Sequence, residues 1–185
     1  MITNFEKLCE DLEKQELESL NGIAPVSVYT QLLAIYLHQN DLCNAKLLWK
    51  RIPLNIISSN PEIPAVWAIG QKLWKKDLAA TYAALLAYNW TEAVSDIISD
   101  LREKIRERSF DLIGKSYSSI SLDTMMTMTG LSKDNVLQAC RDRKWQVSDN
   151  GTTVSPTPPV SPAPLHTSSE DQLFKLTDFV TFLEN

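Results

Sequence analysis

Apolar residues recur at helical spacing through the first two thirds of the chain. Phe5, Leu8, Cys9 and Leu12 form an i, i+3, i+4, i+7 stripe, and residues 3–6 have the Thr-x-x-Glu pattern of a capping box. Further helices are expected near residues 28–38, 42–49, 66–73, 78–86 and from a Thr91 N-cap to about residue 105. Pro53 should end the third helix, and Pro61 and Pro64 bracket the next boundary. The pattern predicts a mainly α chain of stacked, antiparallel helical pairs.

A short internal echo accompanies these helices. The residues Asn40-Asp41-Leu42 recur as Lys76-Asp77-Leu78, 36 positions later, and both triplets open a predicted helix. This offset is close to the roughly 34-residue period of tetratricopeptide-type repeats. The echo indicates either repeated helix pairs of that type or two unrelated helix starts that each carry an aspartate.

The pattern changes beyond residue 115. A short β-prone segment, residues 117–120, precedes Ser121, which can cap a helix carrying Leu122, Met125 and Met126. After a turn at Gly130, Ser132 can cap a second helix, and two short strands at 145–147 and 152–154 flank an Asp-Asn-Gly turn. Strand, helix, turn, helix and hairpin is the order of a winged helix.

The last thirty residues differ in composition from the rest. Residues 155–164 contain five of the nine prolines and no charged residue, which is typical of an extended, semi-rigid tether. A second capping-box pattern at 169–172 then predicts a terminal helix. The predicted organisation is a helical-repeat part at 1–115, a winged-helix part at 116–154, a proline-rich tether at 155–168 and a C-terminal helix at 169–185.

The terminal helix carries the strongest functional signal. Large apolar residues occupy much of its surface, and the exposure of so much apolar surface to water is unfavourable. We expect it to bind a groove or helical bundle made by other chains, although it could instead fold back on its own domain. The candidate partner-binding residues of this helix are Leu173, Leu176, Phe179, Val180, Phe182 and Leu183, with Phe174 as an additional apolar side chain.

Composition and charge narrow the functional classes. The chain has 185 residues, 44% of them hydrophobic, with 18 basic against 23 acidic residues and a net charge of -5. This balance favours protein partners over nucleic acid or an anionic membrane surface. No apolar run is long enough to span a bilayer, the start lacks signal-peptide features, and the three cysteines form no pairing pattern. We therefore expect a cytoplasmic, reducing environment.

Catalytic motifs are missing from the sequence. It contains no GxGxxG, GxxxxGK[ST], HExxH or GxSxG motif, and only two histidines, His38 and His166. Cys140 lies on the apolar side of its helix, where a thiol is usually a small core residue. We expect no catalytic residue, no cofactor and no metal, although a shallow active site could escape motif analysis.

A nucleic-acid-binding winged helix is the main alternative. Its second helix would read DNA, with Lys133, Arg141, Arg143 and Lys144 contacting phosphates. Residues 110–155 contain five basic and five acidic residues, however, so the module would gain little from counterion release. Protein contact is the better use of this fold.

Four segments carry a family resemblance. They are Gln31-Leu32-Leu33-Ala34-Ile35-Tyr36-Leu37, Ala45-Lys46-Leu47-Leu48-Trp49-Lys50-Arg51-Ile52-Pro53, Trp67-Ala68-Ile69-Gly70-Gln71-Lys72-Leu73-Trp74, and the last ten residues, 176–185. Helical repeats leading into a winged helix resemble the PCI domain, shared by the proteasome lid, the COP-nine signalosome and the translation initiation factor three complex. The quoted segments are similar to the smallest signalosome members, with least agreement between residues 154 and 168.

The resemblance implies a non-catalytic scaffold subunit. Such a subunit belongs to a complex that removes the ubiquitin-like modifier Nedd from cullins, with the metalloprotease chemistry in another subunit. Its partners would be the other signalosome subunits, with subunit three as the direct neighbour, and the terminal helix would enter a multi-subunit helical bundle. The family adds the nucleus to the expected cytoplasmic localisation.

The winged helix would supply a second partner surface, a strand edge that pairs with a neighbouring subunit. Its candidate residues are Trp145, Val147 and Val154. Trp49, Trp67 and Trp74, in the middle segments, are expected to pack helix pairs rather than touch partners.

Overall fold

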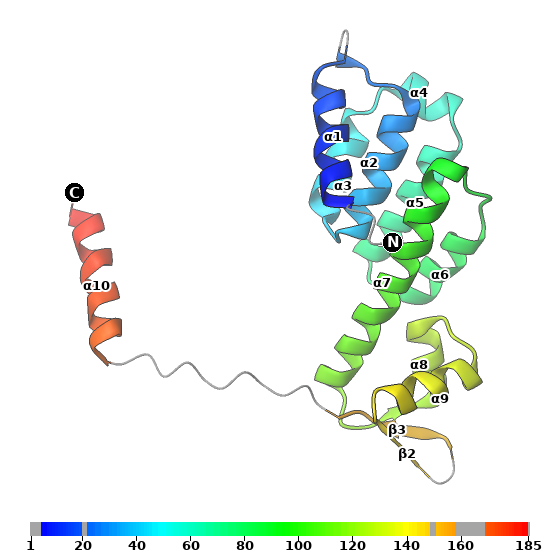
Figure 1. The fold of residues 1–185 in the computed structure, drawn as a ribbon, viewed down its shortest axis with the longest axis vertical. Coiled ribbons are helices and arrows are strands. Elements are labelled where there is room, and N and C mark those ends of the chain that lie inside the picture. The colour runs from blue at the N-terminus through cyan, green and yellow to red at the C-terminus, as the bar shows by residue number, and fades with distance from the viewer. Residues whose placement is uncertain (1–4, 20–21, 149–150, 158–168, 185) are drawn as a thin grey trace.

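Helices make up most of the chain in the computed structural model, which describes residues 5–19, 22–148, 151–157 and 169–184 (Figure 1). The mainly α fold class predicted from the periodicity is confirmed. The first two residues of the capping box, 3 and 4, and the Asp149-Asn150 part of the Asp-Asn-Gly turn lie outside the described residues. The elements in chain order are α1 (Phe5–Leu17), α2 (Val26–His38), α3 (Leu42–Arg51), α4 (Leu54–Ser59), α5 (Glu62–Trp74), α6 (Leu78–Leu86), α7 (Glu92–Ser116), β1 (Ile120–Ser121), α8 (Leu122–Thr129), α9 (Lys133–Asp142), β2 (Gln146–Val147), β3 (Thr153–Ser155) and α10 (Ser169–Glu184).

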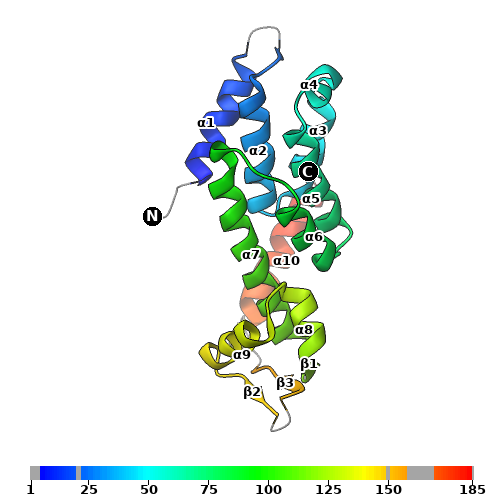
Figure 2. The ribbon, with the colours of Figure 1, turned by 90° about the vertical axis from the view of Figure 1, so that its right-hand side faces the viewer.

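Helix α2 is the centre of the helical part. Its sequence is apolar on almost every face, so burial on all sides is its favourable environment. It packs against α1, α3, α5 and α7, and Figure 2 shows it between α1 and the group formed by α3 to α6. Leu32, Leu33, Ile35 and Leu37 are completely buried there.

The sequence echo forms the same turn twice. Asn40 and Lys76, which precede the two aspartates, both have left-handed backbones, with φ of 64° and 58°. Asp41 and Asp77 each accept a hydrogen bond from the N–H three residues later, at 2.9 and 3.0 Å. Their own N–H groups donate to the carbonyl five residues earlier, at 2.8 and 3.1 Å. The two helix starts therefore share one turn geometry, as repeated helix pairs would.

Helix boundaries around the prolines differ from those predicted. A short helix, α4, follows Pro53, and the periodicity gave no sign of it because six residues are too few to show an apolar stripe. Helix α5 begins at Glu62, so Pro64 lies inside it. Pro64 is tolerated because first-turn N–H groups have no partner within a helix.

Helix α7 connects the two parts of the fold. Its 25 residues place Val94 and Ile105 in the core of the helical part, while Phe110 and Ile113 belong to a second core with β1, α8, α9 and β3. Thr91 is the N-cap, as predicted, but its side chain makes no capping bond to the helix. The Thr91 hydroxyl and N–H instead donate to the buried Glu62 carboxylate, at 3.2 and 2.9 Å.

The segment after α7 has the order predicted for a winged helix. Strands β1 and β2 pair antiparallel with β3, giving the sheet order β1-β3-β2, with helices α8 and α9 packed beside it (Figure 2). Ser121 caps α8 by accepting a hydrogen bond from the Thr124 N–H, as predicted. Ser132 is the N-cap of α9 without a side-chain capping bond.

Gly130 sets the angle between the end of α8 and the helical part. It ends α8 with a left-handed backbone at φ of 62°, and a Cβ placed there would lie 2.7 Å from ring atoms of Tyr82 on α6. Only a residue without a side chain fits both requirements. The packing of α8 against α6 therefore depends on this glycine.

Candidate protein-interaction surfaces

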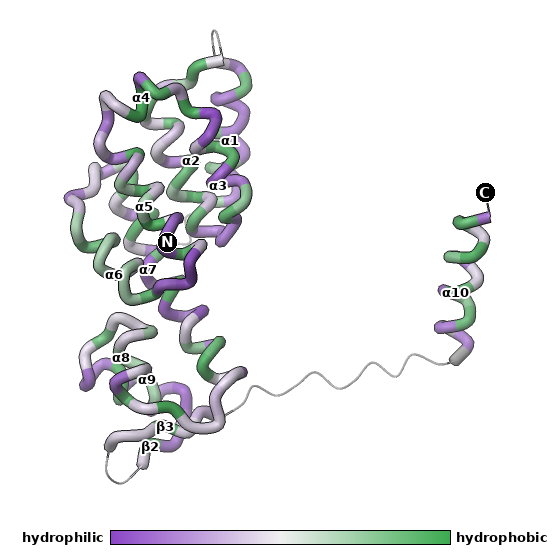
Figure 3. Tube along the Cα trace, turned by 180° about the vertical axis from the view of Figure 1, so that it is seen from behind, coloured by the Kyte–Doolittle hydropathy of each residue, from purple (hydrophilic) through white to green (hydrophobic). Residues whose placement is uncertain are grey.

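Helix α10 presents all of its large apolar side chains to solvent. Their exposed fractions range from 51% for Val180 to 79% for Phe182 and Leu183. Figure 3 shows hydrophobic stretches along the helix, which stands apart from the rest of the chain. The predicted partner-binding residues Leu173, Leu176, Phe179, Val180, Phe182 and Leu183 are all exposed, as is Phe174. Their role in binding stays a prediction, which this exposure permits.

The three-stranded sheet leaves β2 as one of its two edges. Ser148 donates its N–H to the Thr153 carbonyl at 3.0 Å, and Val147 lies opposite Val154 in the register. Hydrogen-bonded and non-hydrogen-bonded pairs alternate in an antiparallel ladder, so Val147 and Val154 form a non-hydrogen-bonded pair. The N–H and C=O of Val147 therefore point to the free edge, where another strand could bind.

The three residues predicted for this edge occupy different environments. Val147 is half-buried on the edge strand, whereas Val154 lies on the central strand and is fully buried in the second core. Because β3 has a strand on each side, Val154 has no free edge of its own. Val147 lies on the edge strand itself, whereas Trp145 precedes β2 and donates its N–H to the Cys140 carbonyl at 2.9 Å. The pairing of these residues with a partner stays a prediction.

Trp145 packs against the C-terminal half of α7. Its ring meets that of Phe110 edge-on, with 5.9 Å between centroids, and covers Gly114. The Arg143 guanidinium carbon lies 4.0 Å from the centre of the Phe110 ring. A cation over an aromatic face is attracted by the ring quadrupole, so Arg143 has a role within the fold. One of the four basic residues considered for phosphate contact is thus already engaged.

His38 is buried at the end of α2, where its ring is paired with Asp100 on α7. Its Nε2 lies 2.6 Å from Asp100 Oδ2, and its Nδ1 has no hydrogen-bond partner among the described residues. Burial lowers the pKa of the imidazole, although the hydrogen bond to Asp100 acts in the opposite direction. His166 lies outside the described residues.

The buried cysteines have raised pKa values. Burial, with the neighbouring Glu13, raises the pKa of the Cys9 thiol to about 12, and burial also raises that of Cys140. Cys140 is completely buried in the second core, as expected for a core residue. Within the described ranges, no group of three or more His, Cys, Asp and Glu side chains has a metal-binding arrangement. Nor does any described helix have the length and apolarity to cross a membrane.

Two of the middle-segment tryptophans pack helices together, as expected. The rings of Trp49 on α3 and Trp67 on α5 stack with 5.5 Å between centroids. Trp74, at the end of α5, is 49% exposed and has the Lys46 ammonium 4.7 Å from its ring centre. Its indole therefore lies partly on the surface.

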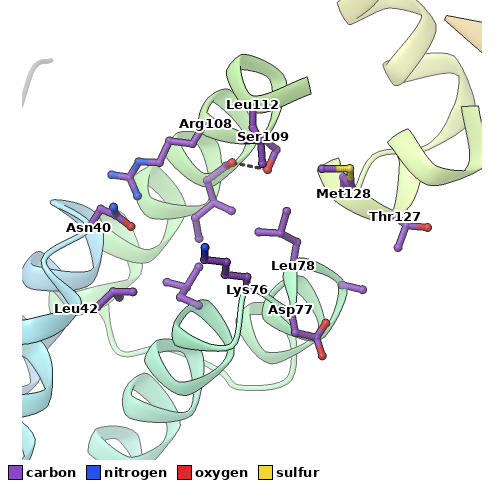
Figure 4. A pocket seen from close by; sticks show the side chains of 13 residues that line it. Asn40, Leu42, Lys76, Asp77, Leu78, Arg108, Ser109, Leu112, Thr127 and Met128 are labelled. Carbon is purple, nitrogen blue, oxygen red and sulfur yellow. Dashed lines mark hydrogen bonds between the residues drawn. The ribbon is translucent and has the colours of Figure 1, made fainter. Parts of the chain in front are cut away.

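A groove of about 540 Å³ lies where the two repeated turns meet α7 and α8 (Figure 4). Its apolar walls include Leu42 and Leu78, which are equivalent positions of the repeat, and Leu112 and Met128 from α7 and α8. Lys76 and Arg108 lie at its polar rim. The groove was not predicted from the sequence because its walls come from four separate segments. The echo at residues 40–42 and 76–78 was the available signal.

Comparison with known proteins identifies the family. Residues 24–164 match the CSN8/PSMD8/EIF3K family. The chain is 43% identical over 183 residues to COP9 signalosome complex subunit 8 of Xenopus laevis, covering 98% of this chain and 93% of that protein. It is 41% identical over 180 residues to the protein of that name from Danio rerio, covering 97% of this chain and 94% of that protein. It is 37% identical over 184 residues to that from Drosophila melanogaster, covering 100% of this chain and 99% of that protein. The chain belongs to the CSN8/PSMD8/EIF3K family.

Proposed function

We propose that the chain is a non-catalytic scaffold subunit of a COP9 signalosome, the complex that removes the ubiquitin-like modifier Nedd from cullins. The similarity to proteins named as subunit 8 supports this assignment, since it extends over nearly the whole length of both chains. The metalloprotease chemistry belongs to a different subunit. The complex works in the cytoplasm and the nucleus.

The observation that carries the proposal is the exposed apolar surface of α10. Burying one side chain such as Leu176 or Phe179 contributes about 1.5–3 kcal/mol before ordering costs. Seven large apolar groups on a 16-residue helix are therefore enough to hold a subunit in a helical bundle. In the complex, α10 packs against helices of the other subunits through this surface.

The free edge of β2 provides the second contact. The outward N–H and C=O of Val147 pair with an edge strand of a neighbouring PCI subunit, with subunit three as the direct neighbour. Main-chain pairing at this edge and apolar packing at α10 are independent contacts, so the subunit is held at two places.

Affinity purification of the tagged full-length chain from cell extract tests the proposal. Mass spectrometry should recover PCI and metalloprotease subunits in stoichiometric amounts. The double variant Leu176→Asp with Val180→Asp should lose them because it places two charges in the apolar surface. The matched control, Thr177→Asp with Thr181→Asp, adds the same charges at polar positions and should keep them. Failure of the unaltered chain to recover these subunits contradicts the assignment, and equal recovery by both variants contradicts the role of α10.

A further inference from the structure

We propose that the groove between the repeated turns, α7 and α8 holds α10 of the same chain until partner subunits withdraw it. The inference rests on the proposed function only for the second step, the withdrawal. Both surfaces are apolar and without a partner in the structure: Leu112 in the groove is 50% exposed, and every large apolar residue of α10 is at least half exposed. A 16-residue helix is marginal in water by itself, so α10 gains from a surface to pack on.

The charges of the two surfaces are complementary. Helix α10 carries four acidic residues and one lysine, a net charge of -3. Two cationic residues line the groove, Lys76 and Arg108. Lys76 forms no ion pair with a described residue, and Arg108 donates one guanidinium N–H to the His38 carbonyl at 2.6 Å. The groove's one carboxylate, on Asp77, is occupied in capping α6. An acidic apolar helix therefore fits this groove better than a basic one does.

The covalent connection brings α10 within reach of the groove. Thr157, the last described residue before α10, has its carbonyl next to Gly114 on α7. The groove residues Arg108 and Leu112 lie six and two positions earlier on the same helix, about 3–9 Å along its axis. Eleven residues, 158–168, separate Thr157 from α10, and a chain of that length spans up to about 36 Å. Arg108 and Leu112 lie on the other side of α7 from Gly114, since each helical residue turns by about 100°, and the connection is long enough to pass around the helix to the groove.

This arrangement makes the two uses of α10 mutually exclusive. Its apolar residues can face the groove or the helices of other subunits, but not both at once. The free subunit thus keeps its most apolar helix covered, and assembly uncovers the groove. A partner bundle has only to bind α10 more strongly than the groove does.

Paramagnetic relaxation in the full-length chain tests this contact. Cys43 is exposed beside Leu42 of the groove wall, and Cys9 and Cys140 are buried, so a nitroxide reagent labels Cys43 in the native protein. We expect the amide resonances of α10 to lose most of their intensity, independently of protein concentration. A second chain, Cys43→Ser with Leu17→Cys, carries the label at the end of α1, and there α10 should keep its intensity.

Matched variants identify the groove as the site. Leu112→Glu places a charge in the groove wall and should restore the α10 signals, whereas Leu47→Glu alters a leucine of similar exposure on α3, outside the groove, and should not. Lys76→Glu should weaken the effect, and adding Asp178→Lys should recover it. Three results overturn the proposal: no signal loss, equal loss from both label positions, or loss that grows with concentration, which means docking onto a second copy. Each is independent of whether the chain recovers signalosome subunits.

Discussion

His38 Nε2 lies 2.6 Å from Asp100 Oδ2, joining the end of α2 to α7. The neutral tautomer with a proton on Nε2 donates to this carboxylate and leaves the buried Nδ1 as an acceptor without a partner. A second proton on Nδ1 would be a buried donor with no acceptor, which is more costly. Burial, with Lys104 and Arg108 nearby, accordingly favours the neutral form and lowers the pKa.

This relationship predicts a stability loss in mild acid. The folded pKa lies below the ordinary value of 6.5, so the unfolded chain takes up the proton first as the pH falls. The contribution of His38 is fully present above pH 6.5 and declines as the pH drops from there towards the folded pKa. Urea unfolding at pH 7.5 and 5.5 should show a larger loss in the unaltered chain than in His38→Gln. Equal losses in the two chains contradict the prediction.

Gly130→Ala should destabilise the contact between α8 and α6. A left-handed alanine costs about 1–2 kcal/mol, and its Cβ would lie 2.7 Å from the Tyr82 ring, adding an overpacking cost of about 1–3 kcal/mol. Gly151→Ala is the matched control, because Gly151 has a φ of 60° but nothing within 4 Å of its Cβ position. Thermal or urea unfolding should therefore show a larger loss at position 130. Similar losses of stability at both positions would show that the contact with the Tyr82 ring adds no cost.

The equivalence of the two repeated turns predicts equal capping energies. Asp41→Ala and Asp77→Ala should each lower the free energy of unfolding by about 1 kcal/mol, because each removes one acceptor for an N-terminal N–H. Asp→Asn at the same positions retains an acceptor and should cost less. Denaturant unfolding of the four variants checks this. A large difference between Asp41→Ala and Asp77→Ala would show that the turns are not energetically equivalent.

Phe110→Ala should destabilise the second core strongly. Phe110 is buried and contacts both Trp145 and Arg143, so its loss leaves a cavity and removes an aromatic pair. A loss of about 3–5 kcal/mol is expected from urea unfolding. Leu112→Ala, two residues further along α7, should cost much less because that side chain is half exposed.

The outward orientation of Val147 predicts the effect of proline at the edge. Val147→Pro removes an N–H that faces away from β3, so the hydrogen bonds of the sheet remain while pairing with a partner strand is lost. Ser148→Pro instead removes the donor to Thr153 and should destabilise the second core. Circular dichroism melting and co-purification of partners separate the two effects. Val147→Pro chains that melt and assemble like the unaltered chain would show that the edge is not used.

The elements that could be predicted from sequence are those that depend on local signals. Apolar stripes predicted six of the helices, and the order of elements after residue 116 predicted the sheet with its two helices. The boundary predicted near Pro64 was wrong, because proline is found both just before a helix and within its first turn, and the sequence does not distinguish the two. Thr91 is the N-cap, yet its hydroxyl binds Glu62, 29 residues away in sequence, which no local pattern indicates.

The surfaces were predictable to a smaller extent. The exposed apolar residues on α10 follow from composition and spacing, since the helix has more large apolar residues than one packed face can bury. The different environments of Val147 and Val154 could not be predicted, because the strand order β1-β3-β2 depends on which strand occupies the centre of the sheet. Predicting the groove would have required still more information, because it depends on the relative placement of four segments.

Because α7 contributes side chains to both cores, the two parts of the fold share a folding unit. The helix is about 37 Å long, and melting either core would expose one half of it and remove the packing that supports the other. The chain should therefore unfold in a single cooperative transition, with the same midpoint reported by probes in either part.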